Sequence, residues 1–503
     1  MGRLGETRGA ALISYASVFF SIAAGLVYTP WMIRTIGQAD YGLYTLATSL
    51  ISLFLMDFGL GSAVARFLSG YYAEGRHGDA ANFLGVVYRF YLIIAGVVAL
   101  VLVGAYFFLG KIYVELSHAE LNTLKSLYVI VATYSVISFP LLPINGVLLA
   151  AERLVSLRLT SLSEKVVTVV LTVGALLLGW GVVGLVAMNA ISNLGFAWLR
   201  YGIARRIPGS AANMAHKDRG LVRRILGFSG WVTVSQLAQR MIFNISPTVL
   251  AAVSGAREIA VFGLAAALEG YVFAFTSALR GMFLPRVSRL LVGKDSSQRM
   301  LDLMVSVGRL QLYVVGLMVI GFASVGREFV SVWLGEQYGV VYTAGLLLMA
   351  PALVEAPQEI AATAVTASDK VRLQAYTYVV MAVLNLVLLG VLAPRLGALG
   401  ASLSICIAYL ARTGMMSAVY SRALQIDMMA YFRRTYGSWL VPAALSLASG
   451  IATAILTAGN GWMGVLAGTL VTALVYASSM MLLSFNDYEK GLLRDALAGF
   501  RRR

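Results

Sequence analysis

Residues 91–110 read YLIIAGVVALVLVGAYFFLG, twenty consecutive residues without a charged side chain. A helix needs about 20 apolar residues to cross the hydrocarbon core of a bilayer, so this stretch predicts a transmembrane helix. The whole chain has a matching composition. Of its 503 residues, 59% are hydrophobic and only 12% are charged, whereas a soluble domain carries roughly 25% charged residues. Most of the chain is therefore predicted to lie within a membrane.

Fourteen stretches of comparable length and hydropathy follow one another along the chain. They lie near residues 10–33, 41–65, 82–110, 123–150, 159–179, 182–204, 225–253, 259–284, 303–326, 338–367, 373–393, 397–421, 437–458 and 461–485. Their length and the lack of a two-residue alternation favour helices over the strands of an outer-membrane barrel. The predicted fold is an all-α polytopic membrane protein.

The basic residues predict the orientation of these spans. The formal net charge is +16, and 30 of the 39 Lys and Arg residues fall on alternate segments that share the side of both termini. Cytoplasmic loops carry such an excess of basic residues, so both termini are predicted to be cytoplasmic. The positive charge then faces anionic lipid head groups, and no feature of the sequence favours a nucleic-acid partner.

The sequence contains no pattern typical of a metal site, a disulfide bond or an enzyme active site. The single cysteine, Cys406, has no partner for an internal disulfide, and His77, His118 and His216 are too scattered for a metal site. The longest predicted outer loop has about a dozen residues, around Lys111, too few for a catalytic domain. We expect no metal, no cofactor and no enzymatic activity.

The chain contains an internal repeat. Pro30 and Pro247 are separated by 217 positions, and Pro140 and Pro357 are separated by the same number. Glu152-Arg153 and Asp369-Lys370 share that offset, and Gly181-Val-Val-Gly184 matches Gly397-Ala-Leu-Gly400 at an offset of 216. Each repeat holds six predicted spans, and the last two spans lie outside it.

This repeat predicts five segments. They are a six-helix bundle over 1–204, a basic cytoplasmic linker over 205–224, a second six-helix bundle over 225–423, an extra helix pair over 424–486 and a cytoplasmic amphipathic tail over 487–503. Internal repeats are typical of transporters, which bind substrate near the membrane midplane where the repeats meet. The alternative is that the duplication serves stability alone.

Polar residues recur at helical spacing within the two corresponding first spans of the repeats. They are Thr233, Gln236, Arg240 and Asn244 in the seventh span and Ser17, Ser21 and Tyr28 in the first. Residues spaced three and four apart share one helical face. Small polar residues also serve dry helix packing, but an arginine in the middle of a span is costly unless it faces a cavity. We predict that Arg240 lines a wet cavity.

Four carboxylates are candidates for ion coupling. Glu355 and Glu359 are four residues apart on one predicted helix, and Glu269 and Asp57 also lie at membrane depth. Two neighbouring carboxylates repel one another, so one of them tends to take up a proton or a sodium ion. The alternative is that one glutamate pairs with an arginine on a neighbouring helix and only fixes packing.

The first quarter of the chain resembles a known family. The segments that carry the resemblance are Tyr28-Thr-Pro-Trp-Met-Ile-Arg34, Ile36-Gly-Gln-Ala-Asp-Tyr-Gly-Leu-Tyr44 and Asp57-Phe-Gly-Leu-Gly61, continuing to Arg66. They resemble the polysaccharide transporter branch of the multidrug/oligosaccharidyl-lipid/polysaccharide exporter superfamily. The resemblance implies a flippase that moves a polyprenyl-pyrophosphate-linked oligosaccharide from the inner to the outer leaflet of the bacterial cytoplasmic membrane.

The resemblance also implies a binding site and partners. In relatives, cavity arginines on the first, second, seventh and eighth spans meet the pyrophosphate, and the comparable residues here are Arg34, Arg66, Arg240 and Arg280. Membrane lipid, a polysaccharide polymerase and a chain-length partner are the implied associates, in pathways such as O-antigen or exopolysaccharide synthesis. Two other functions stay open: a cation-coupled multidrug exporter of the same superfamily and a non-transporting scaffold for envelope assembly.

Overall fold

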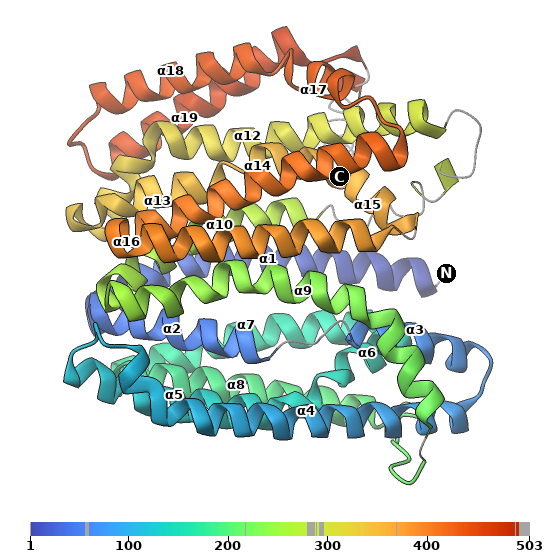
Figure 1. Ribbon diagram of the computed structural model, residues 1–503. Helices are drawn as coiled ribbons and strands as arrows, with labels where there is room; N and C mark the ends of the chain where they lie inside the picture. Colours follow the sequence, from blue (N-terminus) through green and yellow to red (C-terminus); the bar gives the residue numbers. More distant parts are fainter. Residues whose placement is uncertain are drawn as a thin grey trace. The chain divides into compact units, whose positions relative to one another are not determined.

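The computed structural model describes all residues except 1, 56–59, 217, 279–286, 288, 291–295, 369, 488 and 492–503, and the described elements are all helical (Figure 1). They are α1 (Gly2–Ile36), α2 (Gln38–Phe54), α3 (Leu60–Ala73), α4 (His77–Ile112), α5 (His118–Ser138), η1 (Phe139–Leu141), α6 (Pro143–Ala150), α7 (Leu154–Leu177), α8 (Gly181–Ala204), α9 (Arg219–Val253), α10 (Ala256–Ala278), α12 (Ser296–Leu334), η2 (Glu336–Tyr338), α13 (Gly339–Met349), α14 (Ala352–Glu355), η3 (Ala356–Gln358), α15 (Glu359–Ala367), α16 (Val371–Leu424), α17 (Met428–Tyr436), α18 (Leu440–Leu456), α19 (Trp462–Ser479) and η4 (Met480–Ser484). The prediction of an all-α polytopic membrane protein is confirmed.

Ten helices in the described part of the chain are long and apolar enough to cross a membrane, and counting the bent pair α17–α18 as one span gives eleven. The difference from fourteen has identifiable sources. The predicted span 41–65 is divided between α2 and α3, and α9 is not among the ten. The 54-residue α16 covers two predicted spans and counts as one helix, although its backbone breaks at Gly397. Fourteen spans remain a prediction.

The internal repeat is visible in the helix boundaries themselves. Helices α1 and α9 both have 35 residues, and their first and last residues are each separated by 217 positions. Both helices contain an interior proline, Pro30 in α1 and Pro247 in α9. The short 3-10 helices η1 and η3 each place a proline second, and their bounds again differ by 217. Helices α18 and α19 follow the second repeat and have no counterpart in the first.

Glycines at equivalent positions mark a break between two helical segments in both repeats. Gly181, at the start of α8, has φ of 57°, and Gly397, which breaks α16, has φ of 54°. This left-handed region is readily open only to glycine, because a side chain there would clash with the backbone. Two glycines at matching positions therefore give both repeats the same sharp turn between their last two spans.

The described chain divides into two compact units. The first unit comprises residues Met1–Gly263 and Tyr378–Ile405. Its main hydrophobic cluster joins α3, α4 and α6, with Phe83, Tyr91 and Phe139 almost completely buried. Helices α7 and α8 pack closely along each other, and α1 packs against α7. These three helices and α2 frame the site described below.

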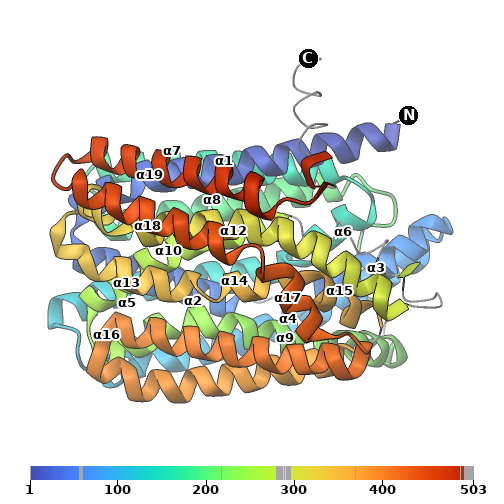
Figure 2. The ribbon, with the colours of Figure 1, turned by 90° about the horizontal axis from the view of Figure 1, so that it is seen from above.

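The second unit comprises Leu264–Thr377 and Cys406–Arg503, and α12 is its central helix. Helices α18 and α19 lie side by side and both pack against α12 (Figures 1 and 2). Their contact is fixed by a hydrophobic cluster that includes Leu312, Ile320 and Trp439. The indole Nε1 of Trp439 donates to the hydroxyl of Tyr476 at 2.8 Å. The extra helix pair is thus an integral part of this unit.

The basic linker between the repeats docks on α4. The Asn213 backbone N–H donates to the carbonyl of Ala81 at 2.9 Å, and the Asn213 amide donates to the side chain of Asn82 at 2.8 Å. Arg89 donates to the carbonyls of Met214 and His216. Arg89 therefore holds the linker against α4 through its backbone carbonyls.

Glycine at position 85 permits this docking, so we expect Gly85→Val to release the linker. A Cβ atom on Gly85 would lie 1.8 Å from the carbonyl oxygen of Asn213, an approach that no side chain can make. Limited trypsin digestion of the protein in detergent should then cut the linker several times faster, because exposed loops are the preferred sites of proteolysis. The control is Gly96→Val on the same helix, where a Cβ atom meets nothing within 4 Å. Equal cleavage rates in the two variants would contradict the expectation.

Candidate functional site

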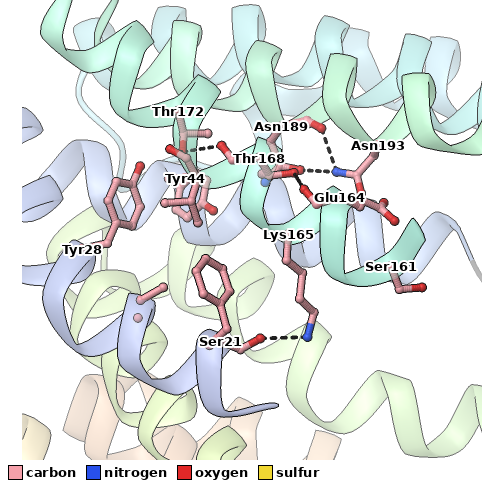
Figure 3. A pocket seen from close by; sticks show the side chains of 14 residues that line it. Ser21, Tyr28, Tyr44, Ser161, Glu164, Lys165, Thr168, Thr172, Asn189 and Asn193 are labelled. Atoms are coloured by element: carbon pink, nitrogen blue, oxygen red, sulfur yellow. Dashed lines mark hydrogen bonds between the residues drawn. The ribbon is translucent and has the colours of Figure 1, made fainter. Parts of the chain in front are cut away.

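A polar pocket of about 510 Å³ lies in the first unit, among α1, α2, α7 and α8 (Figure 3). Pockets that bind small molecules have volumes of about 300–1,000 Å³ and combine apolar walls with a few placed polar groups. The lining residues are Phe20, Ser21, Ala24, Gly25, Tyr28, Tyr44, Ser161, Glu164, Lys165, Thr168, Val169, Thr172, Asn189 and Asn193. The pocket therefore has the size and composition of a ligand site.

Helical periodicity brings these side chains together. On α1, residues 21, 25 and 28 follow one another at spacings of four and three, as do 161, 165, 168 and 172 on α7. Asn189 and Asn193 are four residues apart on α8. Positions three and four apart share a helical face, so each helix presents one polar stripe to the pocket.

Lys165 gives the pocket its positive charge. It lies inside α7, eleven residues after the first residue of the helix. Its Nζ atom donates a hydrogen bond to the hydroxyl of Ser21 at 2.8 Å, across the pocket from α7 to α1 (Figure 3). A serine hydroxyl is a neutral acceptor, so this hydrogen bond does not neutralise the ammonium charge. A ligand anion could therefore replace this hydrogen bond with a stronger, charge-assisted one.

The neighbouring carboxylate, Glu164, is engaged by an arginine. Arg200 of α8 forms an ion pair with Glu164, and both side chains are largely buried. The same guanidinium donates to the hydroxyls of Thr160 at 3.2 Å and Ser161 at 3.3 Å. Arg200 also lines a smaller cavity of about 100 Å³ that shares Glu164 and Asn193 with the main pocket. Because Arg200 balances Glu164, Lys165 sets the sign of the local charge.

The remaining polar groups are held in place by hydrogen bonds. Thr168 donates to the hydroxyl of Ser192 at 2.8 Å, and the Asn193 amide donates to the Asn189 side chain at 2.6 Å. The aromatic rings of Tyr28 and Tyr44 line the same pocket, on the side of Thr172 (Figure 3). Amides, hydroxyls and flat aromatic faces together suit a ligand rich in hydroxyl groups. The lysine adds a contact for an anionic group.

The polar stripe predicted on the first span meets this pocket, whereas the stripe on the seventh span does not. Ser21 and Tyr28 line the pocket, and the carbonyl of Ser17 accepts a hydrogen bond from Ser21 at 2.7 Å. Asn244 donates to the carbonyl of Arg240 on its own helix at 2.9 Å. Thr233 and Gln236 also lie on α9, outside the lining of the pocket.

Arg240 contacts the end of a helix. Its Nη1 atom donates to the carbonyl of Ser52 at 2.9 Å. Ser52 lies two residues before the end of α2, where carbonyls have no partner within the helix and carry partial negative charge. Arg240 thus caps α2, and its side chain is exposed.

Arg34 and Arg66 do not line the pocket. Arg34 is exposed in the last turn of α1, and Arg66 is exposed on α3. Arg280 lies outside the described residues, as does the predicted coupling residue Asp57. Of the four arginines predicted for pyrophosphate binding, the three that the structure describes, Arg34, Arg66 and Arg240, are not among the residues that line the pocket around Lys165.

The three remaining carboxylates lie in the second unit. Glu355 accepts from Arg412 of α16 at 2.6 Å, and the guanidinium is almost fully buried. Glu359 begins α15, and Glu269 lies on α10. The pair of Glu355 and Arg412 joins α14 to α16, so this glutamate contributes to the packing of its unit.

Sequence reasoning missed Lys165, Glu164, Asn189 and Asn193 as site residues and counted Lys165 with the cytoplasmic basic residues. The available signal was position: Lys165 lies inside the predicted span 159–179, where an ionisable residue by itself suggests a functional site. Asn189 and Asn193 lie at a spacing of four within the next span. Nothing in the sequence shows that these two helices meet α1.

Comparisons with known proteins identify the fold. A family model described as "Polysaccharide biosynthesis protein" matches residues 8–290. No curated protein sequence matches the chain. Among solved structures, the lipid II flippase MurJ in an inward closed conformation aligns with a TM-score of 0.68 at 12% identity, covering 96% of this chain and 100% of that one.

Two multidrug transporters have the same fold. An inward-facing multidrug resistance MATE family transporter of the MOP superfamily has a TM-score of 0.60 at 13% identity, covering 80% of this chain and 95% of that one. The Vibrio cholerae MATE transporter VcmN has a TM-score of 0.54 at 16% identity, covering 85% and 100%. At such identities these structures show the fold alone, and together with the family model they confirm the predicted family resemblance.

Proposed function

The chain belongs to the polysaccharide biosynthesis protein family, and from this membership we propose that it is a flippase for a lipid-linked oligosaccharide. The proposed substrate is an oligosaccharide joined to a polyprenyl lipid by a pyrophosphate. The proposed direction is from the inner to the outer leaflet of the bacterial cytoplasmic membrane, with both termini in the cytoplasm. The substrate would serve the synthesis of a surface polysaccharide such as O-antigen or exopolysaccharide.

The observation that carries this proposal is the ammonium of Lys165, hydrogen-bonded to a neutral hydroxyl, in a pocket lined by amides, hydroxyls and aromatic rings. The pyrophosphate of the substrate carries about two negative charges and cannot cross hydrocarbon without a polar, cationic path. Lys165 would supply the cation. Asn189 and Asn193 can each donate to and accept from sugar hydroxyls, and Tyr28 and Tyr44 offer flat apolar faces to a sugar ring.

Transport by this protein would use its repeated architecture. Repeat-built transporters expose a central site alternately to the two sides of the membrane. Outward movement of a negative charge is favourable by about 2.3 kcal/mol per 100 mV when the inside is negative. A doubly charged pyrophosphate therefore gains enough from the membrane potential to bias the direction. Glu269, Glu355, Glu359 and Asp57 are the proposed sites for any additional ion coupling.

A second candidate function is export of cationic drugs. The aromatic residues Phe20, Tyr28 and Tyr44 suit flat organic cations, and Glu164 is a carboxylate at the same pocket. The multidrug transporters of similar fold are consistent with this candidate. The ion pair between Glu164 and Arg200 weighs against it, because a cationic drug would have to displace Arg200 while Lys165 repels the drug.

Reconstitution into liposomes separates the two functions. We expect the purified protein to move a fluorescent oligosaccharide on polyprenyl pyrophosphate between leaflets, measured as the fraction that a membrane-impermeant quencher can reach. The same vesicles should not accumulate cationic dyes above protein-free vesicles. Dye accumulation without movement of the lipid-linked oligosaccharide would overturn the flippase proposal and support the drug exporter. Movement of neither substrate would contradict both.

A further inference from the structure

A second pocket, of about 650 Å³, lies entirely within the second unit. It is formed by the C-terminal end of α12, the 3-10 helix η2, the C-terminal half of α18 and the turn that joins α18 to α19. The lining residues are Ser324, Arg327, Glu328, Ser331, Val332, Glu336, Ile451, Ala454, Ile455, Ala458, Gly459 and Gly461. None of these residues lines the pocket around Lys165.

The position of this pocket along the helices places it at the level of lipid head groups. The 39 residues of α12 span about 58 Å, whereas the hydrocarbon core is about 30 Å thick. At least one end of α12 therefore extends beyond the core, and the two adjacent charged residues Arg327 and Glu328 favour the C-terminal end. Trp462 begins α19 beside the pocket and is half exposed, as is typical of a tryptophan at the membrane interface.

One carboxylate oxygen of Glu328 has no hydrogen-bond partner in the described part of the chain. Its Oε1 atom accepts from the backbone N–H of Gly459 at 3.2 Å. Gly459 has φ of 87°, a left-handed conformation that suits glycine and turns the chain between α18 and α19. The Oε2 atom of Glu328 is buried, and within the described part of the chain it has no hydrogen-bond partner. Such an acceptor is costly to leave unpaired, so the site favours a ligand that donates a hydrogen bond there.

The two walls of the pocket differ in character. Arg327, Glu328 and Glu336 form a charged wall with both signs present. The α18 wall is apolar, and Ile451 and Ile455 on it are exposed by 41% and 71% of their surface. A site with both positive and negative groups beside an exposed apolar helix matches a zwitterionic amphiphile.

We infer that this pocket binds a phospholipid whose head group carries a primary amine, of the phosphatidylethanolamine class. Arg327 pairs with the lipid phosphate, and the ammonium lies between Glu328 and Glu336, donating to the unpaired Oε2 atom. The acyl chains follow α18 along Ile451 and Ile455. Phosphatidylglycerol has no ammonium and would meet two carboxylates, and the methylated ammonium of phosphatidylcholine has no N–H to donate.

Native mass spectrometry of the full chain tests this inference. Purified, delipidated protein in detergent is mixed with equal amounts of phosphatidylethanolamine, phosphatidylcholine and phosphatidylglycerol that have identical acyl chains. We expect retained phosphatidylethanolamine to exceed each of the others by about tenfold, the ratio given by one hydrogen bond to a charged group. A separate sample with water-soluble glycerophosphoethanolamine distinguishes the lipid from its free head group, which should compete only weakly.

Two variants sharpen the test. Glu328→Gln keeps the oxygen that accepts from Gly459 and replaces the unpaired acceptor by a donor, so the preference for phosphatidylethanolamine should disappear without unfolding. Glu115→Gln removes an exposed carboxylate outside the pocket and should leave the preference unchanged. Equal retention of the three lipids by the unmodified chain, or an unchanged preference in Glu328→Gln, would overturn the inference. Full competition by glycerophosphoethanolamine would show that the acyl chains contribute nothing and would overturn the lipid assignment.

Discussion

Transport of the lipid-linked oligosaccharide should fall by about 100-fold when Lys165 is replaced by methionine, the loss expected when one charge-assisted hydrogen bond to the substrate is removed. Methionine retains the length and most of the apolar surface of the lysine, so the pocket keeps its shape. Only the ammonium, which donates to Ser21 in the absence of substrate, is removed. The measurement is the initial rate of leaflet exchange in proteoliposomes at substrate concentrations below saturation.

Lys370→Met is the matched control for this prediction. The Nζ atom of Lys370 also makes a hydrogen bond to a neutral oxygen, the carbonyl of Ala423 at 2.6 Å, and its side chain is exposed. It does not line the pocket. The control variant should therefore transport at nearly the normal rate, and Lys165→Arg should retain part of the activity because it keeps the charge. Equal rates for Lys165→Met and Lys370→Met would remove Lys165 from the substrate site.

The same variant also distinguishes the two candidate functions. For a flippase, loss of the ammonium weakens the contact with the pyrophosphate, so transport decreases. For an exporter of cationic drugs, loss of the ammonium removes a repulsion and leaves Glu164 as the nearest charge, so transport increases or stays the same. The direction of the change in Lys165→Met is therefore informative for either substrate.

The repeat can be predicted from the sequence because the residues that mark it, prolines and glycines, have strong local effects on the backbone. A proline fixes its own backbone angle and removes a hydrogen-bond donor, so Pro30 and Pro247 mark corresponding helices wherever those helices pack. Gly181 and Gly397 mark the same turn in both halves because only glycine adopts the required conformation easily. The hydropathy pattern in addition predicts the approximate lengths of the helices. All of these signals act within a few residues of the chain.

The pocket could not be predicted in the same way, because it depends on which helices become neighbours. Lys165 is 144 residues from Ser21, and Arg240 is 188 residues from Ser52. Periodicity places Ser21 and Tyr28 on one face of α1, and both line the pocket. It predicts a polar face on α9 equally well, but there Arg240 caps the end of α2. Local spacing predicts which residues share one face of a helix. Which other helix that face contacts depends on the packing of the whole unit.

Arg309 of α12 has no predicted role, and the structure places it at the centre of a buried network. Its Nε and Nη2 atoms donate to the two carboxylate oxygens of Glu489 at 2.7 and 3.0 Å. It also donates to the carbonyl of Ser484 at 2.6 Å and to the hydroxyl of Ser438 at 3.0 Å. Only 9% of the Arg309 side chain and 3% of the Glu489 side chain are exposed. The network ties α12 to the segments before α18 and after α19.

Replacement of Arg309 by methionine should destabilise the protein by about 3–5 kcal/mol, because removal of one partner leaves the other charge buried and uncompensated. The matched control is Arg434→Met, which breaks the ion pair with Asp302. Its side chains are 44% and 52% exposed, and such surface pairs contribute about 0–1 kcal/mol. Denaturation in detergent micelles, followed by tryptophan fluorescence, measures both effects. The double variant Arg309→Met/Glu489→Met should recover part of the loss, since no charge is then left unpaired. If Arg309→Met is as stable as Arg434→Met, the charges of Arg309 and Glu489 reach solvent. The extra helix pair is then held by its apolar contacts with α12 instead.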